Sequence, residues 1–197
     1  MLHTSVATLY SNLVTRPTGE AVRVAIERQI ADVKGAALSI LDFSRIGVID
    51  FSCADEIIAK LLRRYSRRDR PGDAFFIAYG MCEHHREPIE SVLGRHRLLL
   101  VAIEDGRPEL WGRAPTRLRD AWRSLNRLGH AGPLELADAQ GIEPTTAAAW
   151  LRRLTASRVA VSDGERFSSL AALWNGERLS PGGESGPVAE RDPSSWH

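Results

Sequence analysis

Ser52 is the residue in this chain whose type and position most clearly suggest chemistry. It lies in the segment 41–55, LDFSRIGVIDFSCAD, which passes from a buried apolar strand through a short polar turn into a helix. A hydroxyl group at a helix start faces free backbone N–H groups and positive partial charge. Ser52 could therefore cap the helix or carry a phosphate group in a prepared anion site.

The residues around Ser52 are compatible with both roles. Residues 52–55 come close to a capping box, in which a serine and an acidic residue three positions later complete the helix start. A phosphate on Ser52 would instead add about −1.5 to −2 charge beside Asp50, Asp55 and Glu56. That charge would repel an acidic partner surface, so the unphosphorylated protein would bind its partner and the phosphorylated protein would release it.

Two further segments hold residue types that can do chemistry. Residues 15–19, TRPTG, could form an anion-binding turn, although proline in the first helical turn favours a plain helix cap. Residues 82–85, CEHH, bring a thiol, a carboxylate and two imidazole rings together on an expected exposed loop. Because the other histidines are scattered along the sequence, this spacing predicts no metal site.

Motifs for nucleotide binding and hydrolysis are missing from the sequence. It holds no glycine-rich dinucleotide-binding motif, no Walker-type loop and no Gly-x-Ser-x-Gly nucleophile elbow. The only cysteines, Cys53 and Cys82, are too few for a disulfide framework, so we expect both to be reduced. We therefore expect a protein that is not an enzyme and uses neither a cofactor nor a metal.

Alternating strands and helices are expected to position Ser52. Near-continuous apolar runs predict buried strands, and apolar residues that recur every three or four positions predict helices packed on the sheet. This pattern ends at residues 112–115 and indicates a small layered α/β domain. The expected strands cover residues 2–10, 38–43, 74–79, 97–103 and 109–111, and the expected helices cover about 20–34, 54–68 and 87–93.

From Thr116 the pattern changes to three helices and a hairpin. The Asp163-Gly164 pair is a favoured hairpin turn between two short strands. The expected helices cover residues 116–128, 134–137 and 145–157, and the expected strands cover 159–161 and 166–167. The chain is thus expected to divide into an α/β domain (1–113), a small helical domain (114–174) and a tail (175–197) whose Gly, Pro, Ser and Glu content predicts disorder.

Charge and hydropathy restrict the classes of partner. Residues 1–114 hold 16 basic and 15 acidic residues, and residues 115–170 hold 8 and 6. Domains of such low net charge bind nucleic acid weakly unless their arginines gather on one face. No apolar run approaches the roughly 20 residues of a membrane span, and the first residues do not resemble a secretory signal. We expect a cytoplasmic protein without membrane contact.

The first domain resembles the STAS domains of bacterial anti-sigma-factor antagonists. In that family a strand ends in an Asp-Ser-Ser-Gly turn, and a cognate kinase-type anti-sigma factor phosphorylates the second serine. Asp50 and Ser52 match the acid and the phosphoacceptor, whereas Phe51 and Cys53 depart from the motif. The resemblance implies a small sheet with helices, phosphorylation of Ser52, and an anti-sigma factor or serine-kinase-like regulator as the protein partner. The residues expected to contact this partner are Asp50, Ser52, Asp55 and Glu56.

The second domain looks like a winged helix-turn-helix. Residues 144–157 would then occupy the position of the recognition helix, whose exposed side chains read DNA bases or contact phosphates. Winged helices also serve as protein-docking modules, so a role in DNA binding and a role in docking both remain open. The candidate DNA-binding residues are Thr145, Thr146, Arg152 and Arg153 in this helix and Arg166 in the wing.

Two functions follow from these observations. In the first, the protein is a bacterial regulatory switch that binds an anti-sigma factor or kinase under the control of Ser52 phosphorylation. In the second, it is a winged-helix transcription regulator that binds DNA, and the STAS-like domain acts as its sensor or dimeriser.

Overall fold

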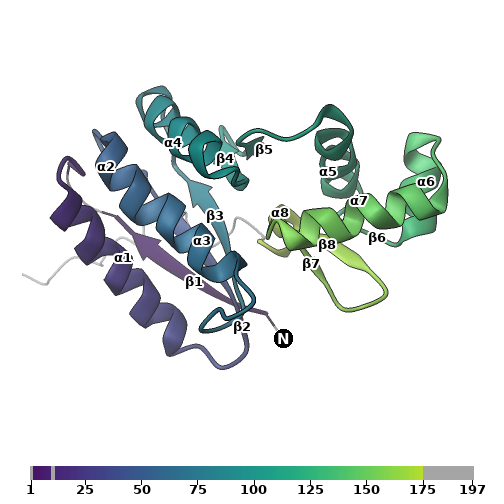
Figure 1. The fold of residues 1–197 in the computed structure, drawn as a ribbon, viewed down its shortest axis with the longest axis horizontal. Coiled ribbons are helices and arrows are strands. Elements are labelled where there is room, and N and C mark those ends of the chain that lie inside the picture. The colour runs from purple at the N-terminus through teal and green to yellow at the C-terminus, as the bar shows by residue number, and fades with distance from the viewer. Residues whose placement is uncertain (1, 10–11, 175–197) are drawn as a thin grey trace, which may run out of the picture.

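A five-stranded sheet forms the frame of the first 111 residues (Figure 1). The computed structural model of the chain describes residues 2–9 and 12–174. Strands β1 to β4 are parallel neighbours in chain order, and β5 pairs antiparallel with β4. The strands are β1 (Leu2–Thr8), β2 (Ala36–Asp42), β3 (Ala74–Tyr79), β4 (Leu100–Glu104) and β5 (Arg107–Trp111). The predicted α/β class is confirmed as a mixed, mostly parallel sheet with helices.

Helices cover one face of this sheet (Figure 1). Side chains alternate along β2, so Ala37 and Leu41 belong to the core under the helices, whereas Leu38 and Ile40 belong to a second core on the other face. The segments α2, η1 and α3 follow one another without a break, and η1 is a π-helical turn. The helical elements of this layer are α1 (Arg16–Ala31), α2 (Phe51–Ala54), η1 (Asp55–Ala59), α3 (Lys60–Ser66) and α4 (Glu83–His96).

The C-terminal segment covers the other face of the sheet. Its buried side chains, including Trp122 and Leu151, share one hydrophobic core with Ile40 and Ile77 of the sheet. Three short strands pair in the order β6-β8-β7 beside the helices. The elements are α5 (Thr116–Leu128), β6 (His130–Ala131), α6 (Pro133–Gln140), α7 (Pro144–Ala156), β7 (Ala160–Ser162), β8 (Phe167–Ser169) and α8 (Leu170–Leu173).

Arg158 joins the C-terminal segment to the start of β3. Its guanidinium lies 3.7 Å from the centre of the Phe75 ring, and its Nη2 donates to Asp73 Oδ1 at 2.6 Å and to the Ala74 carbonyl at 2.7 Å. The Arg158 side chain is only 9% exposed. Shared apolar packing and this buried cation therefore hold the two parts of the chain together.

Several element boundaries differ from the predictions. The helix after β2 begins at Phe51, so Ser52 lies in its first turn as predicted, whereas α4 begins at Glu83 rather than at residue 87. Residues 82–85 are consequently a helix start and not a loop, and His85 is buried. The strand predicted from residue 97 begins at Leu100, because Arg97 ends α4 in the left-handed conformation. The short elements β6 and α8 were not predicted, and the expected tail at 175–197 lies outside the described residues.

Candidate functional site

Asp50, and not Ser52, caps the helix that follows β2. Asp50 has extended backbone angles, and its Oδ1 accepts a hydrogen bond from the Cys53 N–H at 2.7 Å. Ser52 lies one residue inside the helix, after Phe51. The interpretation of Ser52 as the helix cap is therefore wrong, because Ser52 lies inside the helix and its hydroxyl donates to Asp50 instead of accepting from a backbone N–H.

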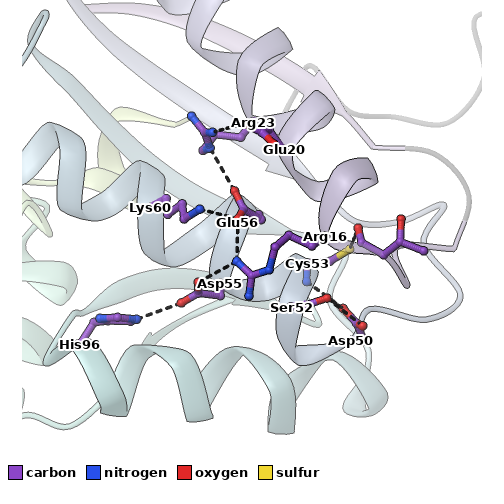
Figure 2. A network of polar contacts seen from close by, with 11 residues as sticks. Arg16, Glu20, Arg23, Asp50, Ser52, Cys53, Asp55, Glu56, Lys60 and His96 are labelled. Carbon is purple, nitrogen blue, oxygen red and sulfur yellow. Dashed lines mark hydrogen bonds and ion pairs between the residues drawn. The ribbon is translucent and has the colours of Figure 1, made fainter.

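The Ser52 hydroxyl instead points to the Asp50 carboxylate (Figure 2). Its Oγ donates to Asp50 Oδ1 at 2.9 Å and Oδ2 at 3.0 Å. Partial burial opposes ionisation of Asp50, but hydrogen bonds from Cys53 and Ser52 outweigh it and lower the pKa of the carboxyl group. Ser52 is half-buried. The turn therefore holds the Ser52 hydroxyl group in a hydrogen bond to an ionised carboxylate.

Backbone contacts and one buried histidine fix the loop that leads to Ser52. The Asp50 N–H donates to the Leu13 carbonyl at 2.9 Å, and the Leu13 N–H donates to the Val48 carbonyl at 2.9 Å. The Nε2 of His85 lies 2.9 Å from the Ile46 carbonyl, and its Nδ1 accepts from the Cys82 N–H. Because Nδ1 accepts, the ring proton lies on Nε2 and donates to Ile46. Burial lowers the pKa of His85, which favours this neutral form.

Three exposed apolar side chains lie on the two segments that adjoin at the Ser52 turn. Val14, Val48 and Phe51 are 49%, 50% and 46% exposed, respectively. Val14 follows Leu13, which pairs with Ile49 in an isolated bridge, so two separate segments bring these side chains to one end of the molecule. Half of the six large apolar side chains that are exposed in the described residues therefore lie around Ser52. We call Val14, Val48 and Phe51 the apolar collar.

Glu56 is the centre of a charged cluster behind the turn (Figure 2). Its side chain is 2% exposed, and Arg16 Nη1 donates to its Oε1 at 2.7 Å. Lys60 binds the same oxygen, and Arg23 Nε lies 3.6 Å from Oε2. Burial opposes ionisation of Glu56, but Lys60 and Arg16 reverse its effect and lower the pKa. Glu56 thus joins α1 to the helix after β2 from inside the protein and offers no surface to a partner.

Asp55 lies at the edge of the same cluster. Its Oδ1 is 2.9 Å from His96 Nε2 of α4, and its Oδ2 is 3.6 Å from Arg16 Nη1. Burial opposes ionisation of Asp55 here too, and the hydrogen bond and charge of His96 together with Arg16 lower its pKa nonetheless. Asp55 therefore connects the continuous helix of α2, η1 and α3, which we call the Ser52 helix, to α1 and to α4.

The start of α1 packs tightly against this helix. Thr15 caps α1 by accepting from the Thr18 N–H at 3.4 Å, which agrees with the prediction of a plain cap. A Cβ atom on Gly19 would lie 2.9 Å from Glu56 Cβ and 3.0 Å from Cys53 Cα, so only glycine allows this approach. The buried Cys53 thiol donates to the Thr15 carbonyl at 2.9 Å, and burial raises its pKa. Cys53 is therefore a packing residue.

The predicted DNA-binding residues lie far from Ser52, in the C-terminal segment. Thr145, Thr146, Arg152 and Arg153 are all exposed on α7. Arg153 lies 5.8 Å from the centre of the Trp150 ring. Arg166 is exposed before β8, and its Nη2 binds both carboxylate oxygens of Glu135 at 3.1 Å. Four of the five residues thus share one helix, and the fifth already has an acidic partner.

Sequence reasoning missed several residues of the Ser52 site. Arg16 and Arg23 come from α1, and His96 comes from α4, at least 29 residues away from Ser52 in the sequence. The collar residues Val14 and Val48 have the apolar type of core residues, so only the structure identifies them as surface. No group of three His, Cys, Asp or Glu residues within the described ranges could hold a metal ion.

Two comparisons with known proteins found no relative of this chain. Neither a scan against protein-family models nor a search of curated proteins gives a match to this chain. Among the described residues, every helix is too short or too polar to cross a membrane.

Proposed function

We propose that this protein is a regulatory switch that binds a protein partner through the Ser52 turn and releases it when Ser52 is phosphorylated. The proposal follows the resemblance of the first domain to the STAS domains of anti-sigma-factor antagonists. Its partner would be an anti-sigma factor or a serine-kinase-like regulator. Asp50, Ser52 and Asp55 would lie in the contact, and Glu56 would hold the turn in place from behind.

The observation that carries this proposal is the division of roles between Asp50 and Ser52. Asp50 satisfies the helix start, so the Ser52 hydroxyl is not needed as a cap. Ser52 is half-buried, and its hydroxyl donates to an ionised carboxylate within 3.0 Å. A serine nucleophile in contact with a base has the arrangement that group transfer to oxygen requires.

The apolar collar supports partner binding at the same place. Protein interfaces combine a desolvated apolar centre, in which aromatic residues are enriched, with a polar rim. Phe51 and the two valines provide such a centre, and Asp50 directly precedes Phe51 in the turn. A partner that fits this surface carries an apolar recess.

Phosphorylation would change this surface in two ways. The modified Ser52 oxygen carries no proton, so the hydrogen bond to Asp50 is lost. The phosphate would also place about −1.5 to −2 charge within reach of the Asp50 carboxylate. Repulsion would then reorient the turn and block the apolar collar, which accounts for release of the partner.

The proposal is tested by incubating the full chain with ATP and a panel of kinase-type anti-sigma factors, followed by mass spectrometry. At least one kinase should modify Ser52 in the wild-type protein and none should modify Ser52→Ala. Ser44→Ala is the matched control, because Ser44 is an exposed serine of the preceding loop. Modification of Ser44 in place of Ser52, or of neither serine across the panel, would contradict the proposal.

The exposed face of α7 favours a second function, binding of DNA by a winged-helix module. Thr145, Thr146, Arg152 and Arg153 are accessible together, as contacts in a major groove require. An Arg152→Ala, Arg153→Ala double variant should then lose salt-dependent binding to its promoter DNA. Retained binding in this variant would show that Arg152 and Arg153 of α7 do not contact the DNA.

A further inference from the structure

The positive charge of the first domain is concentrated at one end of the Ser52 helix. Residues 60–70, KLLRRYSRRDR, hold six basic residues and one acidic residue, a net charge of +5. The remainder of residues 1–114 holds ten basic and fourteen acidic residues, a net charge of −4. The domain is therefore nearly neutral as a whole, but its excess of positive charge lies in one short segment.

These basic side chains lie on α3 and directly after its end. Lys60, Arg63 and Arg64 are spaced by three and four residues, which places them on one side of the helix, and Arg67 and Arg68 follow its last residue, Ser66. The first four of these basic side chains, together with Asp69 and Pro71, line a hollow of about 430 Å³. We call Lys60, Arg63, Arg64, Arg67 and Arg68 the basic face.

The basic face keeps unpaired charge after its internal ion pairs are counted. Lys60 binds Glu56, Arg64 binds Glu27 at 3.1 Å, and Arg67 binds Asp69 at 2.9 and 3.1 Å. Within the described residues, Arg63 and Arg68 are exposed and form no hydrogen bond or ion pair. The Arg67 pair is open to solvent, with side chains 69% and 71% exposed, so an external anion can replace Asp69 there.

This surface suits a ligand recognised by charge and not by apolar contact. Leu61, Leu62 and Tyr65 of α3 are buried, and none of the exposed large apolar side chains in the described part of the chain lies on this helix. A protein interface would need such an anchor at its centre. Contacts to nucleic-acid phosphates need none, because guanidinium groups bind phosphate oxygens directly and in pairs.

We propose that the basic face of α3 binds the phosphodiester backbone of a nucleic acid. Within α3, residues 60–66 span about 9 Å, at 1.5 Å per helical residue. Duplex DNA carries one negative charge per about 1.7 Å of its axis, so an equal length presents about five phosphates. Arg63, Arg67 and Arg68 are the side chains open to these phosphates, so about three contacts are expected.

This surface is separate from the candidate DNA-binding residues of α7. Leu61 and Tyr65 anchor α3 in the core under the helical layer, whereas Leu151 anchors α7 in the core on the other face of the sheet. Figure 1 shows α3 and α7 in different parts of the molecule. Variants in the two helices therefore test two independent surfaces.

The test is fluorescence anisotropy of the full chain with a labelled 20-base-pair duplex and with a single strand of the same length, at increasing NaCl. We expect the logarithm of the association constant for the duplex to fall with the logarithm of salt with a slope of about −2.7, which corresponds to three contacts. The Arg63→Gln, Arg67→Gln, Arg68→Gln variant should bind at least about tenfold more weakly at 50 mM salt, and its slope should shrink by about 2.7.

A matched control separates the basic face from net charge alone. The Arg28→Gln, Arg95→Gln, Arg107→Gln variant removes three exposed arginines from α1, α4 and β5 of the same domain and should bind like wild type. Circular dichroism must show the same unfolding temperature for both triple variants. The proposal is overturned by an equal loss in the control, by absence of binding to both nucleic acids at 50 mM salt, or by binding only to phosphatidylserine vesicles. Loss of binding in the Arg152→Gln, Arg153→Gln variant with none in the α3 variant would also overturn it.

Discussion

The Ser52 hydroxyl donates to both oxygens of the Asp50 carboxylate, at 2.9 and 3.0 Å, while the same carboxylate caps the helix through the Cys53 N–H. One acidic residue therefore sets the position of the helix start and the orientation of the serine. The two roles contribute differently to the free energy of unfolding, and substitutions at Asp50 and at Ser52 measure the two contributions separately.

Asp50→Ala should destabilise the protein more than Ser52→Ala. Loss of an acidic helix cap costs about 1 kcal/mol, with a range of about 0.5–2. Ser52→Ala removes one hydroxyl from a half-buried position and leaves the cap in place, so the free energy of unfolding should change by less than about 0.5 kcal/mol. Urea denaturation measures both. Asp50→Asn retains a capping side chain and should be close to wild type; a larger loss for Ser52→Ala than for Asp50→Ala would refute this division of roles.

Stability should fall in acid because of the carboxylates around Ser52. The pKa values of Asp50, Asp55 and Glu56 are lowered in the folded protein. Their contribution is complete above the unfolded pKa values of about 4 and is lost as the pH falls through the lower folded values. Urea unfolding between pH 7 and pH 3 should show this decline.

Glu56→Gln should flatten the acid decline and lower stability at pH 7. The expected loss at pH 7 is below the roughly 3–5 kcal/mol for breaking a fully buried pair. The reason is that the Arg16 and Lys60 side chains, 54% and 42% exposed, can turn to water. Glu87→Gln on the exposed part of α4 removes the same charge outside the cluster and is the control. An unchanged acid decline in Glu56→Gln would show that the cluster does not cause it.

Gly19→Ala should separate α1 from the Ser52 helix. The new Cβ would meet Glu56 Cβ at 2.9 Å and Cys53 Cα at 3.0 Å, and overpacking of this kind costs about 1–3 kcal/mol. Gly72→Ala is the matched control, since a Cβ there meets nothing within 4 Å. Thermal and urea unfolding of the two variants should differ; equal stability would mean that the helices adjust to the extra methyl group without cost.

Arg158→Ala should loosen the C-terminal segment from the sheet. The Ala74 carbonyl and the Asp73 carboxylate would lose a buried charged donor, for which about 2–3 kcal/mol is expected. Arg152→Ala, on the exposed face of α7, should change stability by less than about 0.5 kcal/mol. Faster proteolysis within residues 112–115 should accompany the Arg158 loss. Wild-type protease resistance in Arg158→Ala would show that apolar packing alone joins the two parts.

The apolar pattern of the sequence predicted the layer of strands and helices because that pattern reflects burial. Residues 74–79 match β3, and the predicted helices at 116–128 and 145–157 match α5 and α7 within one residue. The π-helical turn of η1 could not be predicted from the sequence. It differs from an α-helix in its backbone hydrogen bonds, which span five residues, and not in the types of its side chains. The helix predicted at residues 87–93 begins four residues earlier, at Glu83, and Pro88 lies inside it.

The candidate site was predictable only in its local part. Asp50 and Ser52 are both good capping residues two positions apart, so the sequence could not decide which of them caps the helix. Arg16, Arg23 and His96 reach the site through tertiary packing, which leaves no local signal near Ser52. Val14, Val48 and Phe51 were not recognised as a surface, because apolar residues next to strands and helices ordinarily enter the core.

The most direct test of the switch is calorimetric titration of each candidate anti-sigma factor into protein with serine and into protein with phosphoserine at position 52. We expect binding to the unmodified protein and at least about thirtyfold weaker binding to the phosphorylated protein, since like charges brought together in an interface cost several kcal/mol. Phe51→Ala should weaken binding to the unmodified protein, and Ser44→Asp should not. Equal affinity of a partner for the two forms would contradict the account.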